Sequence, residues 1–155
     1  MRTCLIADPS RLARRVAGQV CARLGFRPME VTSADGLGKA YRRFRPDLTL
    51  VDQSLVGESD IGPLIVSLRY GLGGDKGHIL LTGHDLTDPL IEEAMVAGAD
   101  DHVRKPLDDA ALAQTLRRLS GAERMAVGQS DGWPTQRPAL DKGATGVVIQ
   151  LSDWR

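Results

Sequence analysis

The stretch PDLTLVDQSL, residues 46–55, decides how this chain folds. Its centre is a short apolar run without polar alternation, which predicts a buried strand over residues 47–52. Strands of this kind are typical of parallel sheets whose two faces are both covered by helices. The run ends in a single carboxylate, Asp52, so the strand also delivers an acid to one edge of the sheet.

The same design recurs on both sides of this stretch. Strand-like runs alternate with helix-like segments, which predicts an α/β fold with a parallel sheet. The further strands are expected over 3–7, 28–32, 78–82 and 101–104. The helices are expected over 10–24, 34–44, 61–70, 89–98 and 108–119. Ser10 can cap the first helix and Gly25 can end it.

Four polar residues end or follow the predicted strands. Asp8 ends the first strand, and the others are Asp52, Thr82 and Lys105. Ligand sites of such sheets lie beyond the carboxyl ends of the strands. Two carboxylates there suit Mg²⁺, and a lysine with a hydroxyl suits phosphoryl oxygens. Each residue alone also has a purely structural explanation, but their shared edge favours a site.

Four motifs carry a resemblance to a known family. The stretches LIADPSRLARR, PDLTLVDQSL, ILLTG and AGADDHVRKPL resemble the receiver domain of bacterial two-component response regulators. The resemblance covers residues 2–119. It implies a flavodoxin-like, doubly wound, five-stranded parallel sheet of order 2-1-3-4-5 with five helices.

The resemblance also implies a chemistry. Asp52 would be the phosphoryl acceptor, taking the group from a phosphohistidine on a histidine kinase or a histidine phosphotransfer protein. The implied cofactor is Mg²⁺, held by Asp8, Asp52 and the backbone carbonyl of Ser54.

Three further residues have implied roles. Lys105 would pair with a phosphoryl oxygen, and its bond to Pro106 is cis in the family. Thr82 would move towards the phosphoryl group while His102, in place of the usual tyrosine or phenylalanine, turns inward. This switch would change the surface of the fourth helix, the fifth strand and the fifth helix, where a downstream protein target reads the signal.

The chain departs from the family at the end of its first strand. Receivers carry two adjacent acids there, whereas this chain has Ala7 and Asp8. We expect Asp8 to contact the metal directly. We assign the missing acid to position 7 and expect its absence to weaken metal affinity by about 10–100-fold. Glu58 offers a substitute carboxylate, although loop acids are commonly only solvated.

Three functions compete. The favoured one is a stand-alone receiver that accepts phosphate on Asp52, signals by protein contact and is not an enzyme. The alternative is a degenerate receiver that docks partners independently of phosphorylation. The third, an enzyme or cofactor binder on a related sheet, is disfavoured because no glycine-rich phosphate loop follows the first strand.

Composition sets the cellular context. No apolar run has the length of a membrane span, and we expect a cytoplasmic bacterial protein with reduced, buried cysteines at Cys4 and Cys21. Basic residues on the first two predicted helices indicate either solvated surfaces or docking of an acidic partner: Arg11, Arg14, Arg15, Arg23, Lys39, Arg42 and Arg43. Without an aromatic platform or DNA-binding motif, they do not indicate a nucleic-acid partner.

The character of the sequence changes near residue 120. Residues 1–120 are predicted to form the domain, and residues 121–155 a linker and tail that we expect to be flexible. The tail ends in an apolar, strand-like run at 146–154 that could add to an exposed sheet edge, in this chain or in a partner.

Overall fold

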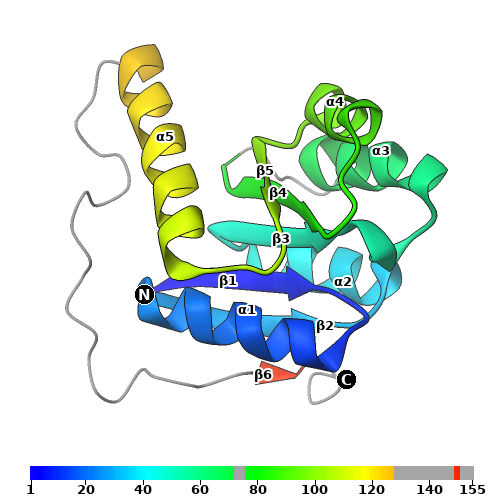
Figure 1. The fold of residues 1–155 in the computed structure, drawn as a ribbon, viewed down its shortest axis with the longest axis horizontal. Coiled ribbons are helices and arrows are strands. Elements are labelled where there is room, and N and C mark those ends of the chain that lie inside the picture. Colours follow the sequence, from blue (N-terminus) through cyan, green and yellow to red (C-terminus); the bar gives the residue numbers. More distant parts are fainter. Residues whose placement is uncertain (72–75, 128–148, 151–155) are drawn as a thin grey trace.

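Six strands form one parallel sheet in this computed structural model, which describes residues 1–71, 76–127 and 149–150. The order is β5-β4-β3-β1-β2-β6, so the predicted order 2-1-3-4-5 is confirmed and a short sixth strand is added beside β2 (Figure 1). The strands are β1 (Arg2–Ala7), β2 (Phe26–Val31), β3 (Leu48–Asp52), β4 (His78–Gly83), β5 (Asp101–Arg104) and β6 (Ile149–Gln150).

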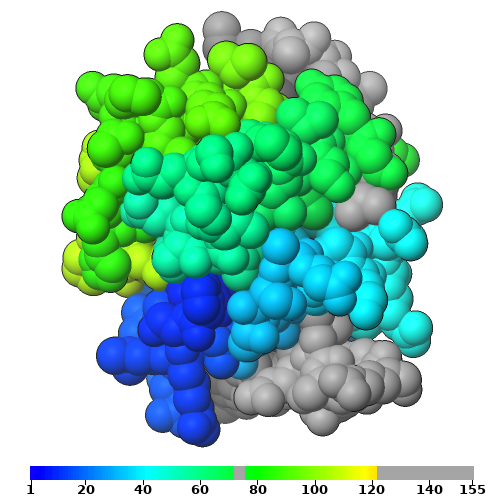
Figure 2. Space-filling view, turned by 90° about the vertical axis from the view of Figure 1, so that its right-hand side faces the viewer, coloured from blue at the N-terminus to red at the C-terminus, as the bar shows by residue number. Residues whose placement is uncertain are grey.

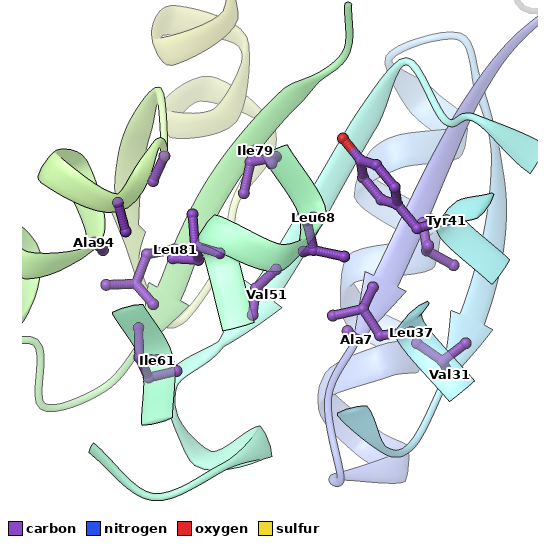
Figure 3. Packing of buried hydrophobic residues seen from close by; sticks show 14 of the residues in the cluster. Ala7, Val31, Leu37, Tyr41, Val51, Ile61, Leu68, Ile79, Leu81 and Ala94 are labelled. Atoms are coloured by element: carbon purple, nitrogen blue, oxygen red, sulfur yellow. The ribbon is translucent and has the colours of Figure 1, made fainter. Parts of the chain in front are cut away.

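Helices cover both faces of the sheet, as predicted for the flavodoxin-like fold. One apolar cluster packs α1 and α5 against β1, β3 and β4. The other packs α2, α3 and α4 against the opposite face (Figure 3). The helices are α1 (Arg11–Arg23), α2 (Ala34–Phe44), α3 (Glu58–Val66), α4 (Asp88–Ala97) and α5 (Asp109–Val127), with a 3₁₀ turn η1 (Gln53–Leu55) and a π turn η2 (Ser67–Gly71).

The turn after β1 shows how local sequence fixes the start of α1. The Asp8 carboxylate accepts a hydrogen bond from Ser10 N at 2.8 Å, and Ser10 Oγ accepts one from Ala13 N at 3.2 Å. Gly25 follows the helix with a φ of 90°, which favours glycine. Both ends of α1 are therefore set by residues predicted to set them.

Two helices differ from prediction. The third begins at Glu58 rather than Ile61, because Gly57 is extended and two acids in the first turn favour a helix N-terminus without adding apolar periodicity. The fifth continues to Val127, past its predicted end at Leu119 and across the boundary predicted at residue 120.

Only part of the predicted tail strand can be compared. Ile149 and Gln150 pair in parallel with Met29 and Glu30 at the edge of β2. The rest of the predicted strand and residues 128–148 lie outside the described residues, and so do both tryptophans.

The two cysteines are free and fully buried, as predicted. Their sulfur atoms are 3.1 Å apart, and burial together with the contact to Cys21 raises the pKa of Cys4 well above its usual value. Among the described residues, no helix is both long and apolar enough to cross a membrane.

Candidate functional site

The strand register brings the predicted residues to one edge. Asp52 pairs directly with Thr82 across β3 and β4, and Lys105 follows β5. The Lys105 amide donates to the Gly83 carbonyl at 2.9 Å, which ties the segment after β5 to the end of β4. Figure 2 views this edge, where the start of α1, the η1–α3 segment and the β4–α4 segment meet.

Asp52 is the most heavily hydrogen-bonded member of the site, with a residue exposure of 3%. Its Oδ1 lies 2.7 Å from Lys105 Nζ and accepts from Thr82 Oγ1 at 3.1 Å. Its Oδ2 accepts from the amide of Ser54 at 3.0 Å and from the Ser54 hydroxyl. Burial raises the pKa of Asp52, but the bonds from Lys105 and Ser54 outweigh it and hold the pKa below its usual value.

Lys105 joins the two acids. Its ammonium contacts Asp8 Oδ2 as well as Asp52 Oδ1, and its side chain is 12% exposed. Burial lowers the pKa of Lys105, but the hydrogen bonds to both acids outweigh it and raise the pKa overall. One ammonium between two carboxylates leaves the group with one excess negative charge. The Lys105–Pro106 bond is cis, as the resemblance implies.

Arg14 belongs to this region although the sequence placed it among exposed basic residues. It is buried, and its Nη1 donates to the carbonyls of Asp8 at 2.9 Å and Pro9 at 3.1 Å. Its Nε lies 3.6 Å from Glu30 Oε1. Arg14 therefore supports the turn that carries Asp8. Its placement in the first turn of α1, six residues after Asp8, was the available signal, but helical spacing alone does not say which way the side chain points.

A cavity of about 220 Å³ opens beside the cluster. Polar residues of the site line it together with apolar residues of β1, β3, α1 and the β5–α5 connection. Its lining includes Leu12, Val16, Thr82, His84, Lys105 and Leu107. Through this cavity a ligand can reach Asp8, Thr82 and Lys105, which are largely shielded from bulk water.

The donor set fits a divalent cation. Two buried carboxylates with an excess negative charge are the ligands a hard ion prefers, and Mg²⁺ usually takes only one or two from a protein. Ser54 directly follows η1's first residue, so its backbone carbonyl is available on the same turn as Asp52. Among the described residues, no three acid, histidine or cysteine side chains are grouped so that they could hold a metal ion. Two carboxylates and a backbone carbonyl would leave room for the waters that Mg²⁺ usually keeps.

The structure does not support position 7 as the place of the missing acid. Ala7 is fully buried in the apolar cluster with Val31, Leu37 and Val51 (Figure 3). Successive side chains of a strand point to opposite faces, so a carboxylate at position 7 would enter this core rather than join Asp8. Pro9, exposed beside Asp8, is the neighbouring position that lacks an acid.

Two of the predicted residues remain to be placed, His102 and Glu58. His102 sits on β5 with a side chain 34% exposed, and its Nδ1 lies 3.4 Å from Asp101 Oδ1. Glu58 is the exposed first residue of α3. The inward turn of His102 and the substitute role of Glu58 remain predictions.

Comparison with known proteins supports the fold. No protein-family model and no curated protein matches the chain. Among solved structures, chemotaxis protein CheY4 of Vibrio cholerae matches with a TM-score of 0.68 at 18% identity, covering 77% of this chain and 98% of that one. A response regulator receiver domain from Bermanella marisrubri matches with a TM-score of 0.65 at 24% identity, covering 76% and 96%.

A third structure carries ligands. The response regulator of Burkholderia pseudomallei, solved with a phosphorylated aspartic acid, a calcium ion and citrate, matches with a TM-score of 0.64 at 19% identity. The match covers 84% of this chain and 75% of that one. The chain therefore has the fold of response regulator receiver domains, as the sequence motifs predicted.

Proposed function

We propose that this chain is a response regulator receiver that accepts a phosphoryl group on Asp52 and signals by protein contact rather than by enzymatic turnover. The observation that carries the proposal is the cluster in which Lys105 joins Asp8 and Asp52 while Thr82 bonds the same Asp52 oxygen. A structural ion pair needs neither the second acid nor the adjoining cavity.

The chemistry follows from the state of Asp52. Its lowered pKa keeps it ionised at neutral pH, so a carboxylate oxygen is available as a nucleophile. That oxygen would form a bond to phosphorus while the bond from phosphorus to the donor imidazole breaks, and the imidazole nitrogen takes a proton. The donor would be a phosphohistidine on a histidine kinase or phosphotransfer protein. Lys105 would then face the new phosphoryl oxygens.

Asp8, Asp52 and the Ser54 carbonyl would hold Mg²⁺, which when bound neutralises charge on the transferring group. Thr82 and His102 would relay the change to the surface of α4, β5 and α5, where a downstream protein docks. Such a relay requires the phosphoryl group to stabilise one of two packings more than the other. We place this activity in the bacterial cytoplasm.

One observation favours the alternative of a phosphorylation-independent docking module. Both oxygens of Asp52 are already hydrogen-bonded, to Lys105 and Thr82 on one side and to Ser54 on the other. A carboxylate held this firmly must give up a partner before it attacks phosphorus. The two functions therefore differ in whether Asp52 reacts at all.

The test is incubation with acetyl phosphate and Mg²⁺, followed by intact mass measurement. The proposal predicts a single phosphoryl adduct that is absent in Asp52→Asn and retained in Asp60→Asn, a matched change at an exposed aspartate of α3. Beryllofluoride with Mg²⁺, followed by NMR, tests the same site without covalent transfer. A wild-type protein that stays inert to both reagents at saturating Mg²⁺ leaves the docking module as the function.

A further inference from the structure

Gln53, the residue after Asp52, makes contacts that the proposed chemistry does not use. Its side chain reaches the segment after β4, where Nε2 donates to the Asp85 carbonyl at 3.3 Å. The Asp85 amide in turn donates to Gln53 Oε1 at 2.9 Å. Both backbone polar groups of Asp85 are therefore held by one side chain from the turn that follows the acceptor.

Gly83 makes this crossing possible. A Cβ atom at position 83 would lie 1.9 Å from Gln53 Oε1 and 2.5 Å from its Cδ, closer than atoms approach in proteins. The three nearest atoms to that Cβ all belong to Gln53. Gly83 does not have a positive φ, so the backbone itself would accept alanine. Glycine is needed here because the Gln53 side chain passes over it.

The two hydrogen bonds between Gln53 and Asp85, which we call the clamp, lie next to the site. Thr82, whose hydroxyl bonds Asp52, directly precedes Gly83, and His84 of the clamped segment lines the cavity. The segment is fixed again further on, where Arg104 Nη1 donates to the Leu86 carbonyl at 2.8 Å. Gln53 holds the segment at Asp85, between Gly83, whose carbonyl accepts from the Lys105 amide, and Leu86.

We propose that Gln53 is a positioning residue: by holding both backbone polar groups of Asp85, it fixes the segment after β4 and keeps Thr82 in place for phosphoryl uptake. The proposal rests on the proposed function of Asp52. Holding reacting groups in a fixed geometry raises the reaction rate by large factors, and a small displacement of those groups lowers it. Gln53 acts through Thr82 and touches no reacting atom.

Two different substitutions remove the clamp. Gln53→Ala deletes the side chain, and Gly83→Ala displaces it while leaving Gln53 in the chain. In each variant we expect the Asp85 amide to exchange with solvent faster, because a local hydrogen bond protects it, and acetyl phosphate uptake to slow by about tenfold. Gln19→Met, at an exposed position of α1, is the control and is expected to change neither.

Double variants separate positioning from general loosening. Adding Gly83→Ala to Gln53→Ala is expected to have no further effect, because the atom that the new Cβ would meet is gone. In a Thr82→Ala background, Gln53→Ala should no longer slow uptake, whereas a merely structural effect would persist. Uptake that slows equally in that background, or that quickens in Gln53→Ala, overturns the proposal.

The exchange measurement is independent of phosphorylation. If the wild type takes up no phosphoryl group, the proposed function fails, and the positioning role is then judged on the Thr82 and Asp85 amides alone. Faster exchange at both in Gln53→Ala supports it. Unchanged protection of Asp85 in that variant shows that Gln53 does not hold the segment and overturns it.

Discussion

Two edges of the same sheet each contain an ion pair, buried at one edge and half-buried at the other, and the two are built differently. At the carboxyl-terminal edge, Lys105 is shared between Asp8 and Asp52. At the amino-terminal edge, Arg69 Nη2 lies 2.6 Å from Asp100 Oδ2, one cation for one acid. The Arg69 guanidinium also donates to the carbonyls of Gly98 at 3.0 Å and Gly77 at 2.8 Å.

The difference distinguishes polar groups that stabilise the fold from polar groups that can bind a ligand. Asp100 also accepts the Ile79 amide at 2.8 Å, so backbone groups and a matched cation satisfy this edge. Burial raises the pKa of Asp100, but bonds from His78 and Ile79 and the charge of Arg69 outweigh it and lower the pKa overall. The opposite edge has an excess negative charge beside a cavity, which a cation can relieve. We infer that ligand binding belongs where charges are unmatched.

Adding a carboxylate at position 7, one residue before Asp8, should have the largest effect on stability. Ala7→Asp places an unpaired acid in the apolar cluster, and we expect a loss of about 4–5 kcal/mol in the free energy of unfolding, measured with urea. Pro9→Asp, at an exposed neighbour of Asp8, is expected to keep the fold and to tighten Mg²⁺ binding. A stable Ala7→Asp protein with tighter Mg²⁺ binding would restore position 7 as the place of the missing acid.

Breaking the ion pair between Arg69 and Asp100 should have the second-largest effect on stability. Arg69→Met removes the paired cation from Asp100 and the donor from two backbone carbonyls, and we expect a loss of about 3 kcal/mol in unfolding free energy. Arg118→Met is the control, since Arg118 also pairs with an aspartate but has a side chain 60% exposed. Equal losses in the two variants would show that the amino-terminal edge is not a structural anchor.

Removing the shared cation should cost less stability and reveal the metal site. In Lys105→Met the cavity that Asp8 lines lets solvent or ions reach the cluster, so we expect a loss of about 1.5 kcal/mol. The excess negative charge doubles, so added Mg²⁺ should raise the melting temperature of Lys105→Met more than that of the wild type. A Mg²⁺ response in Arg69→Met that exceeds the one in Lys105→Met would contradict this charge argument.

The sequence predicted strand ends well because an apolar run that stops at a polar residue marks both the core and its edge. Asp8, Asp52, Thr82 and Lys105 come together for that reason. Side-chain direction within an element was not predictable in the same way. Ala7 was placed at the site although its side chain enters the core, and Arg14 was placed at the surface although it is buried.

Contacts between loops could not be predicted from the sequence for a further reason. The clamp of Gln53 on Asp85 depends on a turn and a segment 32 residues apart, neither of which has periodicity. The available signal was Gly83 at the end of an apolar strand, but a glycine there also fits an ordinary turn. Only the side chain that crosses it explains the glycine.

The smallest predicted effect is a change in the acid limb of the stability curve. The folded-state pKa of Asp100 is lowered, so its stabilising contribution is present above the unfolded value of about 3.9 and is lost as pH falls through the folded value. Asp100→Asn should therefore flatten the fall of unfolding free energy below about pH 4. Asp52 contributes with the same sign, so Asp52→Asn should flatten the remaining slope. Acid limbs as steep in both variants as in the wild type would mean that neither edge holds its carboxylate in the ionised form, and the contrast between matched and unmatched charge would lose its basis.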